Sequence, residues 1–331
     1  MKNSLNEDNN KTICIIGLGQ IGSRHLQALL MCDFNVSIFC VDLNVDSITK
    51  ARSLIPHELP EHIKSIHYLS DIKDLPTEID LAILATSSDI RLKVLKTLLS
   101  HSRTNNIIFE KVLFQNLSHL DEAFAVLNKA GTKSWVNCPR RSWPIYKEIK
   151  DYIDGKDNIF LGLKGGNWGL ACNSIHFIDL FEWLTNSSVK KINSSDLDPN
   201  IFDSKRNGFV EFSGKLVVDY EKGNKLILES NYQQTNETFK IQLSGKGFNL
   251  EILESTGQFI LRDENQIISK QFQVPYQSEL TNLFVKDIFH KKDCCLPTFS
   301  ESHKQHAKML GTFHNHYEKF IGKKVEYCPI T

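Results

Sequence analysis

The sequence has no apolar run that approaches the roughly 18 residues needed to cross a membrane, and it has no net charge. Lys plus Arg and Asp plus Glu both number 39, so charge gives no indication of a nucleic-acid or membrane partner. The eight cysteines are scattered and show no C-x-x-C spacing. Scattered thiols favour a reducing cytoplasm over a disulfide framework. The first eleven residues lack an apolar core segment, so no secretory signal is expected.

One stretch near the beginning, residues 12–42, has a clear pattern. An apolar run, 12–16, is typical of a strand buried on both faces, and it ends in a G-x-G-x-x-G formed around Gly17, Gly19 and Gly22. Helical spacing follows, and a second apolar run, 36–41, stops at Asp42. This order predicts a dinucleotide site in which Gly17 forms the tight turn, Gly19 lets the backbone approach a pyrophosphate and Gly22 lets the helix pack closely.

Asp42 lies 20 residues after Gly22, where a carboxylate can accept hydrogen bonds from a ribose diol. The same carboxylate would repel the 2′-phosphate of NADP, and Leu43 and Asn44 offer that phosphate no cation. The pattern therefore favours NAD. The alternative is a glycine-rich strand–helix turn without a ligand, which leaves the placed acid unexplained.

Apolar runs alternate with helical patterns up to about residue 138, which predicts a doubly wound parallel sheet. The predicted strands are 12–16, 36–41, 65–69, 80–85, 106–109 and 134–137. The predicted helices between them are Val45–Leu54, Asp89–Ser100 and Ser118–Lys129, the last with Ser118 as N-cap.

The alternation of predicted strands and helices ends after Pro139. Predicted helices at Ile145–Ile153 and Asn173–Leu184 flank a strand near 159–164, and residues 190–272 are rich in strands separated by polar turns. Two helices, at about 277–290 and 300–317, follow. The predicted organisation is a disordered tail at 1–11, an α/β dinucleotide-binding domain at 12–138, and an α+β domain with a mainly antiparallel open sheet at 139–331.

Several polar residues lie where ligands of such folds bind, at the carboxyl ends of the parallel strands. Glu110 and Lys111 follow the fifth strand, and Arg140 and Arg141 follow the sixth. Lys111 either reaches a substrate hydroxyl or is a surface lysine. The two arginines are either solvated or bind an anionic substrate, because a guanidinium binds carboxylate or phosphate bidentately.

In the second domain, His176 and Asp179 share one face of a predicted helix, with Asn173 just before them. His176 is either a base or a satisfied core residue among apolar neighbours. Trp168 either stacks on a sugar ring or packs in the core. His303 and His306 also share a helical face, but no acid or thiol at ligand spacing completes a site, so no metal is expected.

Together these motifs resemble the glucose–fructose oxidoreductase/inositol dehydrogenase (Gfo/Idh/MocA) family over nearly the whole chain. The shared features are the G-x-G-x-x-G followed by Arg24-His25, the Glu-Lys after strand five, the Arg-Arg after strand six and the His-x-x-Asp near a helix start. The resemblance implies that a nicotinamide cofactor exchanges hydride with a sugar, inositol or related polyol. It also implies that Lys111 and His176 frame the reacting carbinol. The cofactor contacts expected from the motifs are Gly17, Gly19, Gln20, Ile21, Gly22, Asp42, Thr86, Glu110 and Lys111.

Three positions depart from the family pattern. Val112 replaces a proline, which predicts a less rigid loop after Lys111. Residues 86–91 lack the proline and histidine of the family's Thr-Pro-Asn-x-x-His, and Arg91 stands in the histidine position. Cys172 replaces an acid that can orient the histidine and stabilise its imidazolium, so His176 should be a weaker base unless Asn173 or another group orients it.

The sequence thus predicts a cytoplasmic NAD(H)-dependent oxidoreductase acting on a carbinol of a sugar, sugar acid or nucleotide sugar. The expected substrate contacts are Arg140, Arg141, Trp168, Asn173 and Asp179. Two alternatives stay open: an NAD-dependent glycosidase of the same fold, and a non-catalytic NAD-binding protein. A homodimer or homotetramer is expected, because an open antiparallel sheet has a face to cover and relatives commonly pair through it.

Overall fold

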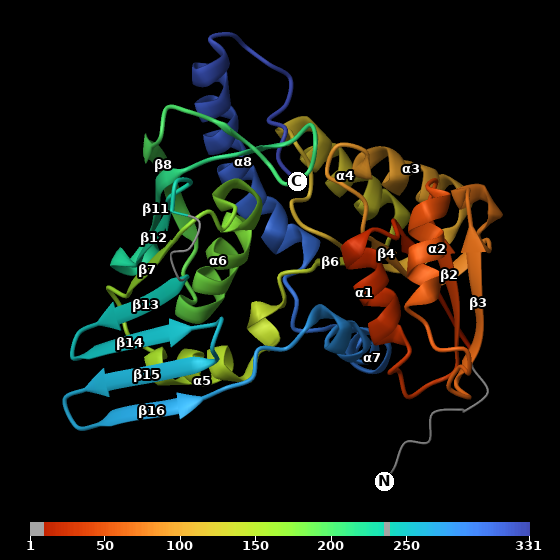
Figure 1. Cartoon of the computed structure of the whole chain (residues 1–331), viewed down its shortest axis with the longest axis horizontal. Helices are drawn as coiled ribbons and strands as arrows, with labels where there is room; N and C mark the ends of the chain where they lie inside the picture. The colour runs from red at the N-terminus through yellow and green to blue at the C-terminus, as the bar shows by residue number, and fades with distance from the viewer. Residues whose placement is uncertain (1–9, 235–238) are drawn as a thin grey trace. The chain divides into compact units, whose positions relative to one another are not determined.

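The computed structural model describes residues 10–234 and 239–331, which form two compact units (Figure 1). Unit 1 contains the chain up to Leu113, Asp121–Asn137 and Pro275–Phe299. Unit 2 contains Phe114–Leu120, Cys138–Val274 and Ser300–Thr331. Both units are therefore assembled from separate stretches of chain. A division into domains at 138 stays a prediction.

Unit 1 is built on a parallel sheet with the strand order β3-β2-β1-β4-β5-β6. The expected doubly wound Rossmann topology is confirmed. The strands are β1 (Lys11–Ile16), β2 (Val36–Val41), β3 (Ile63–Leu69), β4 (Glu78–Leu84), β5 (Arg103–Phe109) and β6 (Lys133–Val136). Ile13, Ile15 and Ile83 are fully buried, as a sheet covered on both faces requires. Lys11, expected in the tail, is the first residue of β1, and residues 1–9 lie outside the described residues.

The helices of this part of the chain begin within a few residues of the predicted positions. They are α1 (Gln20–Leu29), α2 (Val45–Ser53), α3 (Arg91–His101), α4 (Leu117–Ala130) and α7 (Thr281–Lys291), with 3₁₀ turns η1 (Ile72–Asp74) and η4 (Gln277–Glu279). The sequence predicted Ser118 as the N-cap of α4, and this prediction is wrong. The cap is Asn116, whose Oδ1 accepts hydrogen bonds from the backbone N–H of His119 at 2.8 Å and from Ser118 Oγ at 3.1 Å.

Unit 2 is built on a mixed, mainly antiparallel sheet with the order β16-β15-β14-β13-β7-β12-β11-β8. Its strands are β7 (Phe160–Gly165), β8 (Val189–Leu197), β11 (Gly214–Tyr220), β12 (Lys225–Ser230), β13 (Lys240–Gly245), β14 (Phe248–Leu253), β15 (Gln258–Asp263) and β16 (Ile267–Gln271). The parallel pair β7–β12 interrupts the expected meander. A separate small ribbon joins β9 (Phe202–Asp203) to β10 (Val210–Glu211).

One face of this sheet is apolar and the other is largely charged. Leu161, Leu228 and Leu250 are buried on the inner face, where α6 packs against β12. Ion pairs such as Lys240–Glu251 connect neighbouring strands on the outer face. The helices that accompany the sheet are α5 (Pro144–Ile153), α6 (Leu170–Thr185) and α8 (Phe299–Ile321), with 3₁₀ turns η2 (Pro139–Ser142) and η3 (Glu221–Gly223).

Helix α6 begins three residues earlier than predicted. Gly169 has φ +79°, a left-handed conformation that suits glycine and ends the preceding loop, so the helix begins at Leu170. Cys172 and Asn173 are consequently inside the first turn. Among the described residues, no helix is long and apolar enough to span a membrane.

Candidate cofactor and substrate sites

The glycine turn after β1 has the shape that a dinucleotide requires. A side chain at Gly17 would come within 2.9 Å of the backbone of Ala85 and Thr86, and one at Gly22 would collide with the carbonyl oxygen of Gly17 at 1.9 Å. A side chain at Gly19 would meet nothing within 4 Å. Gly19 is also the N-cap of α1 and so offers no capping side chain. The turn is therefore tightly packed beneath and open above the helix N-terminus, where a pyrophosphate can accept backbone hydrogen bonds.

Asp42 is held against this turn. Its Oδ2 accepts a hydrogen bond from Leu18 N–H at 2.6 Å, and its Oδ1 accepts one from Asn44 N–H at 2.8 Å. Each carboxylate oxygen keeps a second lone pair for a ribose hydroxyl. Asn44 caps α2 through Asp46 N–H and Ser47 N–H, and Leu43 is exposed, so this turn presents no cation to a 2′-phosphate.

Arg91 connects the loops that follow β4 and β5. Its guanidinium donates hydrogen bonds to the carbonyl oxygens of Thr86 and Val112, and to that of Leu113 at 2.9 Å. Arg91 is only 1% exposed, and Val112 and Leu113 are fully buried. The Lys111–Val112 peptide bond is cis. The loop after Lys111 is therefore a buried, hydrogen-bonded segment, although Val112 replaces the proline, and the predicted lower rigidity stays a prediction.

Glu110 and Lys111 face different environments at the end of β5. Glu110 is buried, and its Oε1 accepts hydrogen bonds from His25 Nε2 at 3.0 Å and from Asn137 Nδ2 at 2.5 Å. Burial raises the pKa of the Glu110 carboxyl, but the hydrogen bonds and charge of its partners, His25 first, bring it below its usual range. Lys111 is half-exposed, whereas every residue from Val112 to Asn116 is buried. Lys111 can therefore reach a ligand, while Glu110 is occupied inside the unit.

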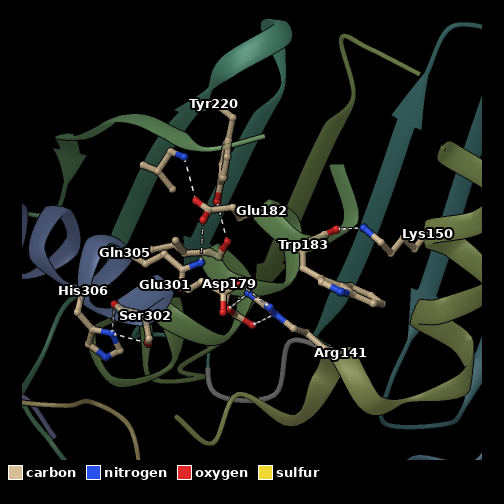
Figure 2. Close-up of polar contacts among 12 residues, drawn as sticks. Arg141, Lys150, Asp179, Glu182, Trp183, Tyr220, Glu301, Ser302, Gln305 and His306 are labelled. Atoms are coloured by element: carbon tan, nitrogen blue, oxygen red, sulfur yellow. Dashed lines mark hydrogen bonds and ion pairs between the residues drawn. The ribbon is translucent and has the colours of Figure 1, made fainter. Parts of the chain in front are cut away.

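In unit 2, Arg141 of η2 binds Asp179 of α6, as Figure 2 shows. Arg141 Nε and Nη2 donate to the two carboxylate oxygens at 2.9 Å and 2.5 Å, and Arg141 Nη1 lies 3.4 Å from Glu301 Oε1. Burial raises the pKa of Asp179 to about 6, although Arg141 opposes this shift by its charge and hydrogen bonds. Both residues thus have partners within the unit.

Arg140 is likewise neutralised. Its Nε and Nη2 donate to Glu254 Oε1 and Oε2 at 2.9 Å and 2.7 Å, and Tyr146 Oη donates to Glu254 Oε1 at 2.5 Å. The Trp168 indole donates to the carbonyl oxygen of Glu229 at 2.9 Å. Neither arginine is simply solvated, which was one alternative from the sequence.

Three neighbouring residues of α6 form an accessible face. From Leu170 to Phe181, only Cys172, Asn173 and His176 are not buried. Their spacing places them on one side of the helix. Asn173 Nδ2 donates to the carbonyl oxygen of Trp168 at 2.8 Å. His176 is therefore half-exposed beside polar neighbours rather than enclosed in the core.

Sequence reasoning missed a buried carboxylate at this helix start. Glu211 of β10 is 5% exposed, and its Oε2 accepts a hydrogen bond from Ala171 N–H at 2.8 Å. A side chain added at Gly169 would meet Cys172 Sγ at 2.8 Å, Asn173 Nδ2 at 3.1 Å and Glu211 Oε1 at 3.2 Å. The carboxylate thus lies beside Cys172 and Asn173. No local signal could identify it, because Glu211 is 39 residues after Cys172 in the sequence.

His306, one of the two histidines considered for a metal site on α8, has a structural partner. His306 is fully buried, and its Nδ1 donates to the carbonyl oxygen of Ser302 at 2.9 Å. Across residues 10–234 and 239–331, no cluster of three or more His, Cys, Asp or Glu side chains is arranged to hold a metal ion.

Comparison with known proteins agrees with the nucleotide-binding architecture. Residues 11–138 match the model of the GFO_IDH_MocA family, an oxidoreductase family with an NAD-binding Rossmann fold. The match covers less than half of the 331 residues, and it agrees with the expected resemblance and with an NAD-binding Rossmann fold in this part of the chain. No curated protein matches the chain significantly in sequence.

Solved structures share the fold over nearly the whole chain. An oxidoreductase from Agrobacterium radiobacter, in complex with NAD+, L-tartaric acid and magnesium, has a TM-score of 0.70 at 12% identity and covers 95% of this chain and 97% of its own. UDP-N-acetylglucosamine 3-dehydrogenase GnnA from Acidithiobacillus ferrooxidans has a TM-score of 0.68 at 9% identity, with coverages of 92% and 97%. Scyllo-inositol dehydrogenase from Lactobacillus casei, with NAD(H) and scyllo-inositol, has a TM-score of 0.66 at 16% identity, with coverages of 94% and 98%.

Proposed function

We propose that the protein is an NAD(H)-dependent oxidoreductase that transfers hydride between the nicotinamide and a carbinol of a sugar, sugar acid or nucleotide sugar. The observation that supports this most directly is the half-exposed Lys111 at the carboxyl end of β5, in the same parallel sheet as the glycine turn and Asp42. When bound, NAD(H) accepts or supplies hydride at C4 of the nicotinamide. Gly17, Gly19, Gln20, Ile21, Gly22, Asp42 and Thr86 would hold its phosphates and ribose.

Two residues would act on the substrate hydroxyl. Lys111 would donate a hydrogen bond to the reacting oxygen and stabilise developing negative charge. His176 would take the hydroxyl proton as general base. Cys172 cannot orient His176 as an acid would, but Asn173 and the carboxylate of Glu211 lie at the same helix start. These groups would hold the helix turn that carries His176.

The contacts of Arg140 and Arg141 favour a structural role over the binding of an anionic substrate that the sequence suggested. Arg140 and Arg141 each bind a carboxylate bidentately, so neither offers its full charge to an anionic substrate. We propose that they and Asp179 shape the substrate site, and that Trp168 and Asn173 contact the substrate through hydroxyl groups. Neutral sugars and polyols therefore belong in the substrate search beside sugar acids and nucleotide sugars.

The test is a panel of these compounds with NAD+, read as absorbance at 340 nm, followed by single substitutions. Lys111→Ala and His176→Ala should lower turnover by roughly two to four orders of magnitude and leave NAD binding nearly unchanged. Lys129→Ala and His57→Ala, at exposed positions, are matched controls. Normal turnover in His176→Ala would reject the assignment of this residue.

The other outcomes identify the alternatives. Cleavage of glycosides without net NADH formation would indicate an NAD-dependent glycosidase. Tight NAD binding without turnover on the whole panel would indicate a non-catalytic NAD-binding protein. Either result would replace the proposed dehydrogenase activity.

We also propose a homodimer or homotetramer in the cytoplasm. The outer face of the unit 2 sheet exposes Phe160 among its charged residues, and Ile267 of the edge strand β16 is 72% exposed. Light scattering tests the assembly, and a mass near the 37.9 kDa of one chain at micromolar concentration would contradict it.

A further inference from the structure

The carboxylate of Glu110 holds the backbone of the lysine that follows it. Glu110 Oε2 accepts a hydrogen bond from Lys111 N–H at 3.3 Å. The other oxygen, Oε1, accepts hydrogen bonds from His25 Nε2 at 3.0 Å and from Asn137 Nδ2 at 2.5 Å. Glu110, His25 and Asn137 are all buried, so water does not compete for these contacts. The orientation of the carboxylate, and with it the contact to Lys111, therefore depends on His25 and Asn137.

His25 is itself held from its other side. It belongs to α1, the helix that begins in the glycine turn, and α1 packs against η4 and α7. His25 Nδ1 lies 2.8 Å from Oγ1 of Thr281, the first residue of α7, and Gln277 Nε2 of η4 donates to the same oxygen at 3.0 Å. Thr281 is fully buried. Both nitrogens of the His25 imidazole thus have partners, which fix the rotation of the imidazole.

The donors and acceptors determine the tautomer of His25. Burial raises the pKa of Glu110, but the hydrogen bonds and charge of its partners bring it below the ordinary value, so the carboxyl is ionised at neutral pH. A carboxylate only accepts, so His25 Nε2 carries the hydrogen of that contact. The Thr281 oxygen accepts from Gln277, which leaves its own hydrogen for His25 Nδ1. His25 is therefore a neutral imidazole protonated at Nε2, and every donation points toward Glu110.

We propose that His25 and Thr281 are positioning residues for Lys111 and that they act through Glu110. This inference rests on the proposed function, in which Lys111 stabilises charge on the reacting oxygen, and adds the buried support of that lysine. Neither residue has to touch the substrate. A displacement of about 1 Å can remove much of the effect of a catalytic group, so losing this support should lower turnover while Lys111 is still present.

Thr281→Val tests the contact on the far side of His25 from Lys111. Valine lacks the hydroxyl, so His25 Nδ1 and Gln277 Nε2 both lose a partner. With a compound from the panel that reacts, kcat should fall roughly five- to tenfold, the worth of one hydrogen bond, while the affinity for NAD+ stays nearly unchanged. Thr281→Ser is the matched control. It keeps the hydroxyl and should have a kcat close to that of the unmodified protein.

A double-mutant cycle separates positioning from general damage. If Thr281 acts through Lys111, Thr281→Val should not lower kcat further in a Lys111→Ala protein. An equal fall in both backgrounds would overturn the inference, and so would a normal kcat in Thr281→Val. Gln277→Ala, at a half-exposed position, removes the donor to Thr281 and should lower kcat in the same direction. It takes the place of Thr281→Val if that protein does not fold.

Hydrogen exchange followed by mass spectrometry measures the same support without turnover. The peptide that contains the Lys111 amide should exchange roughly five- to tenfold faster in Thr281→Val than in Thr281→Ser, whereas peptides of β1 should not differ. Unchanged exchange at Lys111 would overturn the inference even if the protein forms NADH from a sugar. Faster exchange in a protein that turns over no compound of the panel would support the buried contact to Lys111 and overturn the proposed function.

Discussion

Arg141 and Asp179 form a bidentate ion pair that is buried on both sides, with side-chain exposures of 7% and 1% (Figure 2). A pair of this kind stabilises one arrangement of η2 on α6, the helix that carries His176. Each charge depends on the other, because an isolated charge is expensive to bury. The main effect of the pair is therefore to stabilise the packing of η2 against α6 in unit 2.

Removing one partner should destabilise the protein strongly. Arg141→Ala should lower the free energy of unfolding by about 3–5 kcal/mol, because the Asp179 carboxylate would remain buried without its cation. Urea unfolding measures the change. Lys96→Ala, which breaks the exposed Lys96–Glu122 pair, should cost no more than about 1 kcal/mol. An Arg141→Ala protein of normal stability that no longer binds substrate would identify Arg141 as a substrate contact instead.

Asp42 should set the choice of cofactor. The unmodified protein should bind NAD(H) at least roughly tenfold more tightly than NADP(H), because the carboxylate beside the glycine turn repels a 2′-phosphate. Asp42→Ala should weaken NAD binding and reduce the difference in affinity between NAD(H) and NADP(H). Fluorescence titration with NADH and NADPH gives both affinities. Equal affinities in the unmodified protein would contradict this prediction.

Arg91 should keep Lys111 in position. Arg91→Lys retains the charge but cannot serve the carbonyl oxygens of Thr86, Val112 and Leu113 together. Its kcat should fall more than its affinity for NAD+, because the loop after Lys111 would loosen while the glycine turn stays intact. Arg103→Lys, at an exposed position on β5, is the control. A variant with normal kcat would show that Lys111 does not need this support.

The ionisation of Glu110 should make the free energy of unfolding depend on pH. Its pKa in the folded protein lies below the ordinary value of 4.5, so the unfolded chain binds more protons in this range. The stabilising contribution is complete above about pH 4.5 and is lost as the pH falls through the lower folded value. The free energy of unfolding of the unmodified protein should therefore fall toward acid pH more steeply than that of Glu110→Gln. Parallel curves between pH 3.5 and 6 would refute the assignment.

The parallel-sheet half was readable from sequence because its signals are local. Strands buried on both faces give continuous apolar runs, and the glycine turn and Asp42 have fixed spacings from them. Lys111 and His176 were also predicted as site residues from short motifs, and both are half-exposed in the structure. These two predictions needed only motifs of a few residues.

The partners of these residues could not be read in the same way. Glu254 binds Arg140 across 114 positions of sequence, and Asn137 meets Gln277 across 140. Many carboxylates and amides are equally plausible partners until the fold selects one. Even the start of α4 was ambiguous, because Asn116 and Ser118 are both good caps and only the backbone geometry distinguishes them.

Some hydrogen bonds of unit 1 join residues that lie far apart in the sequence, and this separation determines when they can form during synthesis. His25, Glu110 and Asn137 leave the ribosome 140 or more residues before Gln277. At roughly 5–20 residues per second, that interval lasts about 7–28 s. During this time Asn137, at the end of β6, lacks its partner Gln277, whereas Glu110 can already bind His25 and Asn137. The hydrogen bonds of Gln277 with Asn137 and Thr281 can therefore form only after residues 138–274 have emerged.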